Sequence, residues 1–130
     1  MNQLKEDITN LVLIAVIILL LDAVYLTFIT RFFSTMIKEI QKSDMKVKAF
    51  PAGIAYLILT VVLYFVLLRD NQPIWKASLL GLAIYGVYDA TNMATISGWN
   101  PRFAMIDTLW GVVCFTSTSA IYYYIKSLLG

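Results

Sequence analysis

Four long apolar runs alternate with short polar stretches along the chain. The runs cover about residues 8–30, 50–68, 75–96 and 103–125. A helix rises about 1.5 Å per residue, so a run of about 20 residues crosses the roughly 30 Å hydrocarbon layer of a membrane. The pattern predicts an all-α membrane protein, a single integral membrane domain over residues 1–130 folded as an antiparallel bundle of four transmembrane helices.

The stretch between the first two runs is basic and amphipathic. Apolar residues recur at helical spacing from Phe32 to Ile40, and polar residues take the other face. This favours an extension of the first helix or a separate helix lying in the membrane interface; a solvated connector is the alternative. We expect its lysines to favour an anionic lipid surface: Lys38, Lys42, Lys46 and Lys48.

The last two runs are joined by a turn that the sequence defines closely. In SGWNPR, Gly98 is placed to end one helix, Asn100 to cap the next and Pro101 to open it. Runs three and four therefore form a tight helical hairpin. The chain ends and the short turn after residue 68 share one side of the membrane, here the terminal side; the other is the connector side.

Three of the runs each carry one aspartate at a similar depth. Counted along each helix, Asp22, Asp89 and Asp107 lie roughly 6 to 12 Å from the connector side. Across the hairpin, the heights of Asp89 and Asp107 differ by only about 3 Å, so these two acids can face each other. A charge at this depth is costly unless it is partnered, hydrated or neutralised, which predicts a shared interior site.

Hydroxyl, amide and indole groups surround the acids in the sequence. Residues three or four positions apart share a helix face, and others form an adjacent stripe. The predicted polar pocket therefore contains, beside the three aspartates, Tyr25, Tyr85, Tyr88, Thr91, Asn92, Thr95 and Trp110. Such oxygen-rich groups suit protons, hard cations or hydrogen-bonded solutes, but the ligand spacing of a calcium or magnesium site is missing. No metal and no cofactor are predicted.

Small residues at four-residue spacing predict close helix packing in the third run. Ala77 pairs with Gly81, and Gly86 with Ala90 and Ala94, while Gly111 offers a flat site on the fourth run. Polar groups that hydrogen-bond between closely packed helices can simply hold a bundle together. This structural role is the main alternative to a functional pocket.

Composition supports the membrane assignment and excludes other classes. Hydrophobic residues make up 60% of the 130 residues, and the mean hydropathy is +0.77. A net charge of +2, with basic residues dispersed between apolar runs, argues against nucleic-acid binding. The single cysteine, Cys114, excludes an internal disulfide, and the absence of histidine leaves carboxylates to carry any proton chemistry.

Basic residues favour one orientation in the membrane. Six lie on the connector side and four on the terminal side: Arg31, Lys38, Lys42, Lys46, Lys48 and Arg102 against Lys5, Arg69, Lys76 and Lys126. The positive-inside rule then predicts a cytoplasmic connector with both termini on the opposite side.

Three segments resemble a family of small membrane proteins found in bacteria and large DNA viruses. These segments are LLLDAVYL (19–26), YGVYDATNMAT (85–95) and GWNPRFAMIDTLWG (98–111). The family is catalogued as a domain of unknown function. The resemblance implies a four-helix membrane fold and no activity; Tyr25 stands where the family usually has tryptophan, and the basic connector is longer here.

Three functions are compatible with these features. The preferred hypothesis is a polar pocket that binds or moves a proton or a small polar solute, and a transporter of this size would need a homodimer or larger assembly. The second is a structural or scaffold membrane protein, for example of a viral particle, whose polar residues only lock the bundle. The third, a lipid-modifying membrane enzyme, lacks a nucleophile and base at recognisable spacing.

Overall fold

The computed structural model describes residues 2–130, and all of its secondary structure is helical. The helices are α1 (Asn2–Gln41), α2 (Ala49–Leu63), α3 (Ile74–Thr95) and α4 (Pro101–Leu129). A π-helical turn, η1 (Tyr64–Leu68), continues α2 without a break. No strand occurs in these residues, which confirms the all-α prediction.

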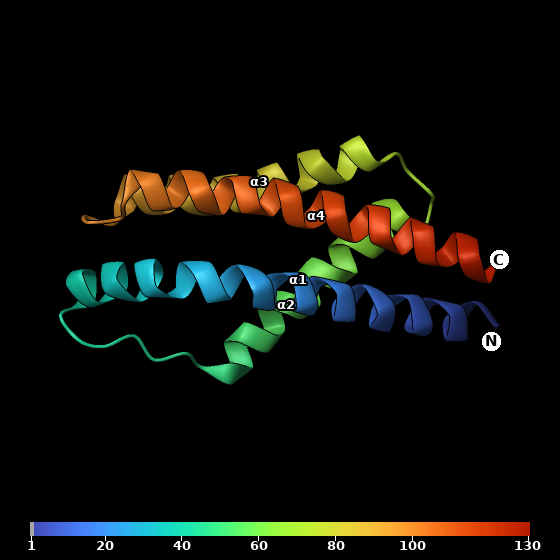
Figure 1. Ribbon diagram of the computed structural model, residues 1–130, viewed down its shortest axis with the longest axis horizontal. Helices are drawn as coiled ribbons and strands as arrows, with labels where there is room; N and C mark the ends of the chain where they lie inside the picture. Colours follow the sequence, from blue (N-terminus) through green and yellow to red (C-terminus); the bar gives the residue numbers. More distant parts are fainter. Residues whose placement is uncertain (1) are drawn as a thin grey trace.

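The helices α3 and α4 form the most extensive pair and lie side by side, with α1 alongside α4 (Figure 1). The helix α2 runs obliquely to the other three and contacts α1. Both chain ends and the turn between η1 and α3 lie at the terminal side, and the 42–48 connector lies at the other (Figure 1). The arrangement therefore differs from a regular four-helix bundle in the tilt of α2.

The turn between α3 and α4 is built as the sequence predicts. Gly98 has φ +90, a left-handed conformation that glycine adopts without strain. Asn100 caps α4, because its Oδ1 accepts hydrogen bonds from the backbone N–H groups of Arg102 at 2.8 Å and Phe103 at 3.4 Å. Pro101 follows at the first helical position. This turn fixes the register of the α3–α4 hairpin.

The amphipathic stretch after residue 31 belongs to α1. The helix is continuous to Gln41, and its apolar face packs on the α3–α4 turn: Phe33 stacks on Phe103 at 5.0 Å between ring centroids and meets Trp99 edge-on at 6.2 Å. The extension is therefore what the structure shows, and a separate interfacial helix is not present in residues 2–41. The lysines Lys38, Lys42, Lys46 and Lys48 are exposed.

Within residues 2–130, three helices are long and apolar enough to cross a membrane. They are α1, the continuous α2–η1 helix over Ala49–Leu68, and α4. The 22 residues of α3 give it the length of a span, but its hydropathy falls short of the other three. At 40 residues and about 60 Å, α1 extends well beyond the hydrocarbon layer at its ends.

Two glycines allow α3 and α4 to touch. A Cβ atom on Gly81 would overlap the backbone carbonyl of Gly111, and a Cβ on Gly111 would overlap the Tyr85 ring. The side chains of Ala90 and Ala94 instead lie on the exposed side of α3. Close packing in this hairpin therefore depends on Gly81 and Gly111 and not on the whole small-residue series.

Replacing Gly81 with alanine is expected to destabilise the protein by about 1–3 kcal/mol, because the new methyl group is forced against backbone. Gly86→Ala is the matched control on the same helix: its Cβ would meet Thr108 Cγ2 at an ordinary 3.6 Å. That variant should be neutral or gain up to about 1 kcal/mol from helix propensity. Thermal unfolding in detergent measures both; a Gly81→Ala variant that melts at or above the parent contradicts this packing.

Candidate functional site

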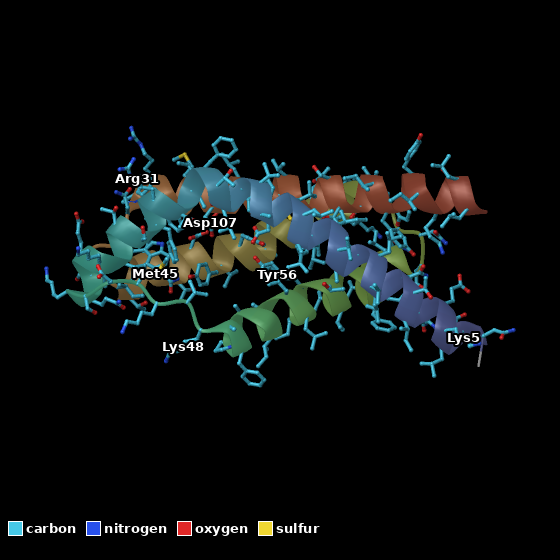
Figure 2. All side chains as sticks on the ribbon, turned by 60° about the horizontal axis from the view of Figure 1, so that its bottom comes forward. Lys5, Arg31, Met45, Lys48, Tyr56 and Asp107 are labelled. Atoms are coloured by element: carbon cyan, nitrogen blue, oxygen red, sulfur yellow. The ribbon has the colours of Figure 1, made fainter. Side chains whose placement is uncertain are left out.

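The three membrane-depth aspartates come from three helices that meet inside the molecule. Asp22 lies on α1, Asp89 on α3 and Asp107 on α4. Figure 2 shows Asp107 and Tyr56 between the helices, with Arg31 and Lys48 toward one end of the molecule and Lys5 at the other. We refer to Asp22, Asp89 and Asp107 as the acid cluster.

Asp22 is held by donors from two other helices. The Tyr56 hydroxyl of α2 donates a hydrogen bond to Asp22 Oδ2, and the Trp110 indole Nε1–H of α4 donates to Asp22 Oδ1 at 3.0 Å. Both carboxylate oxygens are therefore satisfied. Asp22 ties α1 to α2 and α4 at once.

A reciprocal contact joins α1 to α4. Tyr25, three residues after Asp22, donates its hydroxyl to Asp107 Oδ1 at 3.1 Å, while Trp110, three residues after Asp107, donates to Asp22. The Tyr25 and Trp110 rings stack between the two acids, with centroids 4.6 Å apart and planes 6° from parallel. Each helix thus supplies one acid and one aromatic donor.

Asp89 is the most deeply buried of the three acids, with 1% of its surface exposed. The Thr108 hydroxyl donates to Asp89 Oδ2 at 3.2 Å, but within residues 2–130 Asp89 Oδ1 has no hydrogen-bond partner. The carboxyl of Asp107 and the indole of Trp99 are its neighbours. Trp99 Nε1 is buried without a partner as well. Asp89 Oδ1 and Trp99 Nε1 are therefore neighbouring buried groups, and neither forms a hydrogen bond of normal distance and angle within residues 2–130.

No basic side chain neutralises the acid cluster in the described part of the chain. The ion pairs found there are Lys38–Asp44, which involves the 42–48 connector, and Arg69–Asp7 at the terminal side, and neither includes an acid of the cluster. Arg31 and Arg102, the cations nearest in sequence on the connector side, are exposed. The acids are partnered by neutral hydroxyl and indole groups alone.

The structure brings some of the remaining predicted pocket residues together and separates others. Tyr85 is partly buried and packs against Gly111 and, edge-on, Phe115. Tyr88 meets Trp99 edge-on at 5.8 Å but is about half exposed, at 49%. Asn92 is partly buried. Thr91 and Thr95 lie on the exposed face of α3, where the Thr95 hydroxyl donates to the Thr91 carbonyl at 2.8 Å.

Three neighbours of the acid cluster were not predicted: Tyr56, Trp99 and Thr108. Trp99 lies in the hairpin turn and Thr108 follows Asp107 on α4, so both follow from the register of the hairpin once Asp89 is placed. Tyr56 is one of three hydroxyl residues in its apolar run, with Thr60 and Tyr64, and the sequence does not distinguish it from them. Its partner depends on how α2 crosses α1, which the sequence does not reveal.

A second polar network, absent from the sequence-based expectations, lies at the terminal side. Asp7 precedes the first apolar run and forms an ion pair with Arg69, with Nε–Oδ1 at 3.1 Å and Nη2–Oδ2 at 3.3 Å. The Tyr64 hydroxyl donates to Asp7 Oδ1 at 2.6 Å. The Tyr64 hydrogen bond, followed by those of Gln3 and Arg69, lowers the pKa of Asp7 below its ordinary value.

The helices and the acid cluster together define the class of the protein. It is an all-helical membrane protein with buried aspartates that no basic side chain neutralises. A family model described as "Predicted membrane protein (DUF2177)" matches residues 8–124, so the chain belongs to this family. The match confirms the resemblance inferred from the sequence. No curated protein and no solved structure matches the chain.

The Asp7 network makes the stability of the folded protein depend on pH. A carboxyl whose pKa is lowered by folding stabilises the protein above its unfolded pKa, about 3.9, and that contribution is lost as pH falls through the folded value. Asp7→Asn should therefore melt below the parent at neutral pH, and the two melting curves should converge below about pH 4. Asp44→Asn, whose ion pair with Lys38 is exposed, is the control and should change little at either pH. A constant Asp7→Asn deficit down to low pH contradicts this assignment.

Proposed function

We propose that this chain is a four-span, multi-pass membrane protein whose acid cluster binds a proton or a small polar solute. The proposal includes α3 as the fourth span, with Asp89 turned inward against α4. The buried position of Asp89 and the close α3–α4 contact support this placement. The basic residues of the connector side support a cytoplasmic connector with both termini on the opposite side.

The observation that carries the proposal is the unpaired oxygen of Asp89. A buried carboxylate with one free oxygen and no cation is expensive, and a second carboxyl beside it raises the cost further. A proton shared between Asp89 and Asp107 removes both problems: a protonated carboxyl becomes a hydrogen-bond donor, so Asp89 Oδ1 can donate to its neighbour. The unpaired Trp99 indole N–H offers a donor to a solute that replaces the proton.

The three acids have different roles in this proposal. Asp22 has a donor on each oxygen and holds α1, α2 and α4 together. Asp107 accepts a hydrogen bond from Tyr25 on Oδ1 and is a neighbour of Asp89. Asp89 is the acid that gains and loses the proton. Movement of a solute across the membrane would require a second copy of the chain, because four helices enclose little space.

A structural role is the second candidate, and the completeness of the Asp22 contacts favours it. Neutral hydrogen bonds between membrane helices contribute about 0.6–2 kcal/mol each. Under this alternative the acid cluster locks the helices, and the exposed lysines after residue 41 bind an anionic membrane or a partner protein. The two candidates differ at Asp89, where a structural role leaves an oxygen unused.

Asparagine substitutions separate these candidates. Asp89→Asn mimics the protonated acid, and its amide can donate toward Asp107, so this variant should melt at or above the parent temperature from about pH 5 to 9. Asp22→Asn is the matched comparison: its amide N–H₂ must face the Tyr56 or Trp110 donor, so this variant should melt lower throughout that range. If Asp89→Asn loses as much stability as Asp22→Asn at every pH, the acid cluster is structural and the proposed site is wrong.

A further inference from the structure

A polar cavity of about 390 Å³ opens at the terminal side, between α1, the η1 end, the following turn and α4. Its lining includes Glu6, Asn10, Arg69, Asp70, Tyr122 and Lys126. Lys126 lies 19 residues beyond Asp107 on α4, which places the cavity about 28 Å from the acid cluster. The volume falls within the ~300–1,000 Å³ typical of small-molecule sites. This cavity is therefore a separate site.

The lining of the cavity includes a partly buried cation with spare hydrogen-bonding capacity. Lys126 Nζ donates to Asn10 Oδ1 at 2.9 Å, and Asn10 is 4% exposed. Asn10 Nδ2 in turn donates to the Tyr64 hydroxyl at 3.1 Å, which fixes the amide. Within residues 2–130 Lys126 makes no ion pair, so its ammonium has neutral support and two further N–H donors. This position suits a carboxylate or phosphate.

The rim of the cavity has the opposite charge. Glu6 and Asp70 are exposed and make no ion pair in the described residues. Arg69 is already held by Asp7 through two of its nitrogens. A ligand entering the cavity therefore meets carboxylates outside and the Lys126 ammonium inside. This arrangement of charges suits a zwitterion whose anionic group points inward and whose amine points outward.

The backbone around the cavity has two uncommon features, a π-helical turn and a residue with positive φ. In an α-helix residues three and four positions apart align, but the π turn η1 closes a five-residue bond from the Arg69 N–H to the Tyr64 carbonyl at 2.8 Å. Tyr64 and Arg69 can therefore both reach Asp7. Asn71 follows with φ 54, an uncommon conformation for a residue other than glycine. π turns occur frequently at functional sites.

We infer that this cavity binds a zwitterionic group that combines a phosphate or carboxylate with a primary ammonium. The anion would lie against Lys126 and Tyr122, and the ammonium would lie against Glu6 and Asp70. Two sources share this chemistry: the head group of an aminophospholipid at the membrane surface, and a free zwitterion of similar size. The inference does not depend on the acid cluster.

Binding to delipidated protein in detergent tests the inference. Phosphatidylethanolamine should bind about tenfold or more tightly than phosphatidylglycerol, which lacks the amine, or phosphatidylcholine, whose ammonium has no N–H. Native mass spectrometry or the lipid-dependent rise in melting temperature measures this order. Free phosphoethanolamine identifies the source: if it competes with the lipid, the head group suffices, and if it does not, the site requires the lipid. Equal binding of phosphatidylglycerol overturns the inference, as does the absence of binding by all of these compounds.

Two sets of variants locate the site. Lys126→Met should weaken phosphatidylethanolamine binding about tenfold or more, whereas Lys5→Met, an exposed lysine at the same end that does not line the cavity, should leave it unchanged. The double variant Glu6→Gln, Asp70→Asn changes only exposed side chains, so it keeps the fold even if Lys126→Met does not. It should remove the preference for phosphatidylethanolamine over phosphatidylglycerol. A preference that survives in the double variant overturns the inference.

Discussion

In a protein whose outer surface is mostly apolar, an acid or amide side chain on the inside needs a hydrogen-bond partner, and here these partners come from other helices. This constraint organises the structure at both ends. Asp22 meets Tyr56 and Trp110, Asp107 meets Tyr25, and at the terminal side Lys126 meets Asn10. The contacts link α1 to α2 and α4, so the polar groups position the helices that apolar packing alone would leave free to slide. Within residues 2–130, three buried polar atoms have no partner: Asp89 Oδ1, Trp99 Nε1 and Thr118 Oγ1. Asp89 is the only acid among them.

The two glycines explain how a polar interior and a tight hairpin coexist. Gly81 and Gly111 bring α3 and α4 into backbone contact, and Tyr85 fills the space above Gly111. Asp107 lies four residues before Gly111 on α4, and the close contact of the two helices therefore holds it beside Asp89. The cap at Asn100 sets the register that this contact requires. A short turn, a close approach and a pair of buried acids are thus one local arrangement.

The hairpin was predictable from the sequence because its register depends on local signals. Gly98, Asn100 and Pro101 fix the turn, so counting residues along each helix places Asp89 opposite Asp107. Thr91 was misleading: two positions after Asp89, it points to the other side of the helix, where the structure shows it exposed. Tyr56 was not predictable, since α2 is apolar around its circumference and the 42–48 connector does not fix its rotation. The terminal cavity was missed because it depends on a π turn, for which the residues of η1 carry no recognisable signal.

We propose that in this member of the DUF2177 family Asp89 carries a proton that it shares with Asp107. Infrared spectroscopy of the protein in lipid measures this directly, since a protonated carboxyl has a C=O stretching band separate from that of a carboxylate. The account predicts such a band at neutral pH in the parent protein and its loss in Asp89→Asn, with the band retained in Asp22→Asn. A parent spectrum in which all buried carboxyls are ionised at neutral pH would contradict it.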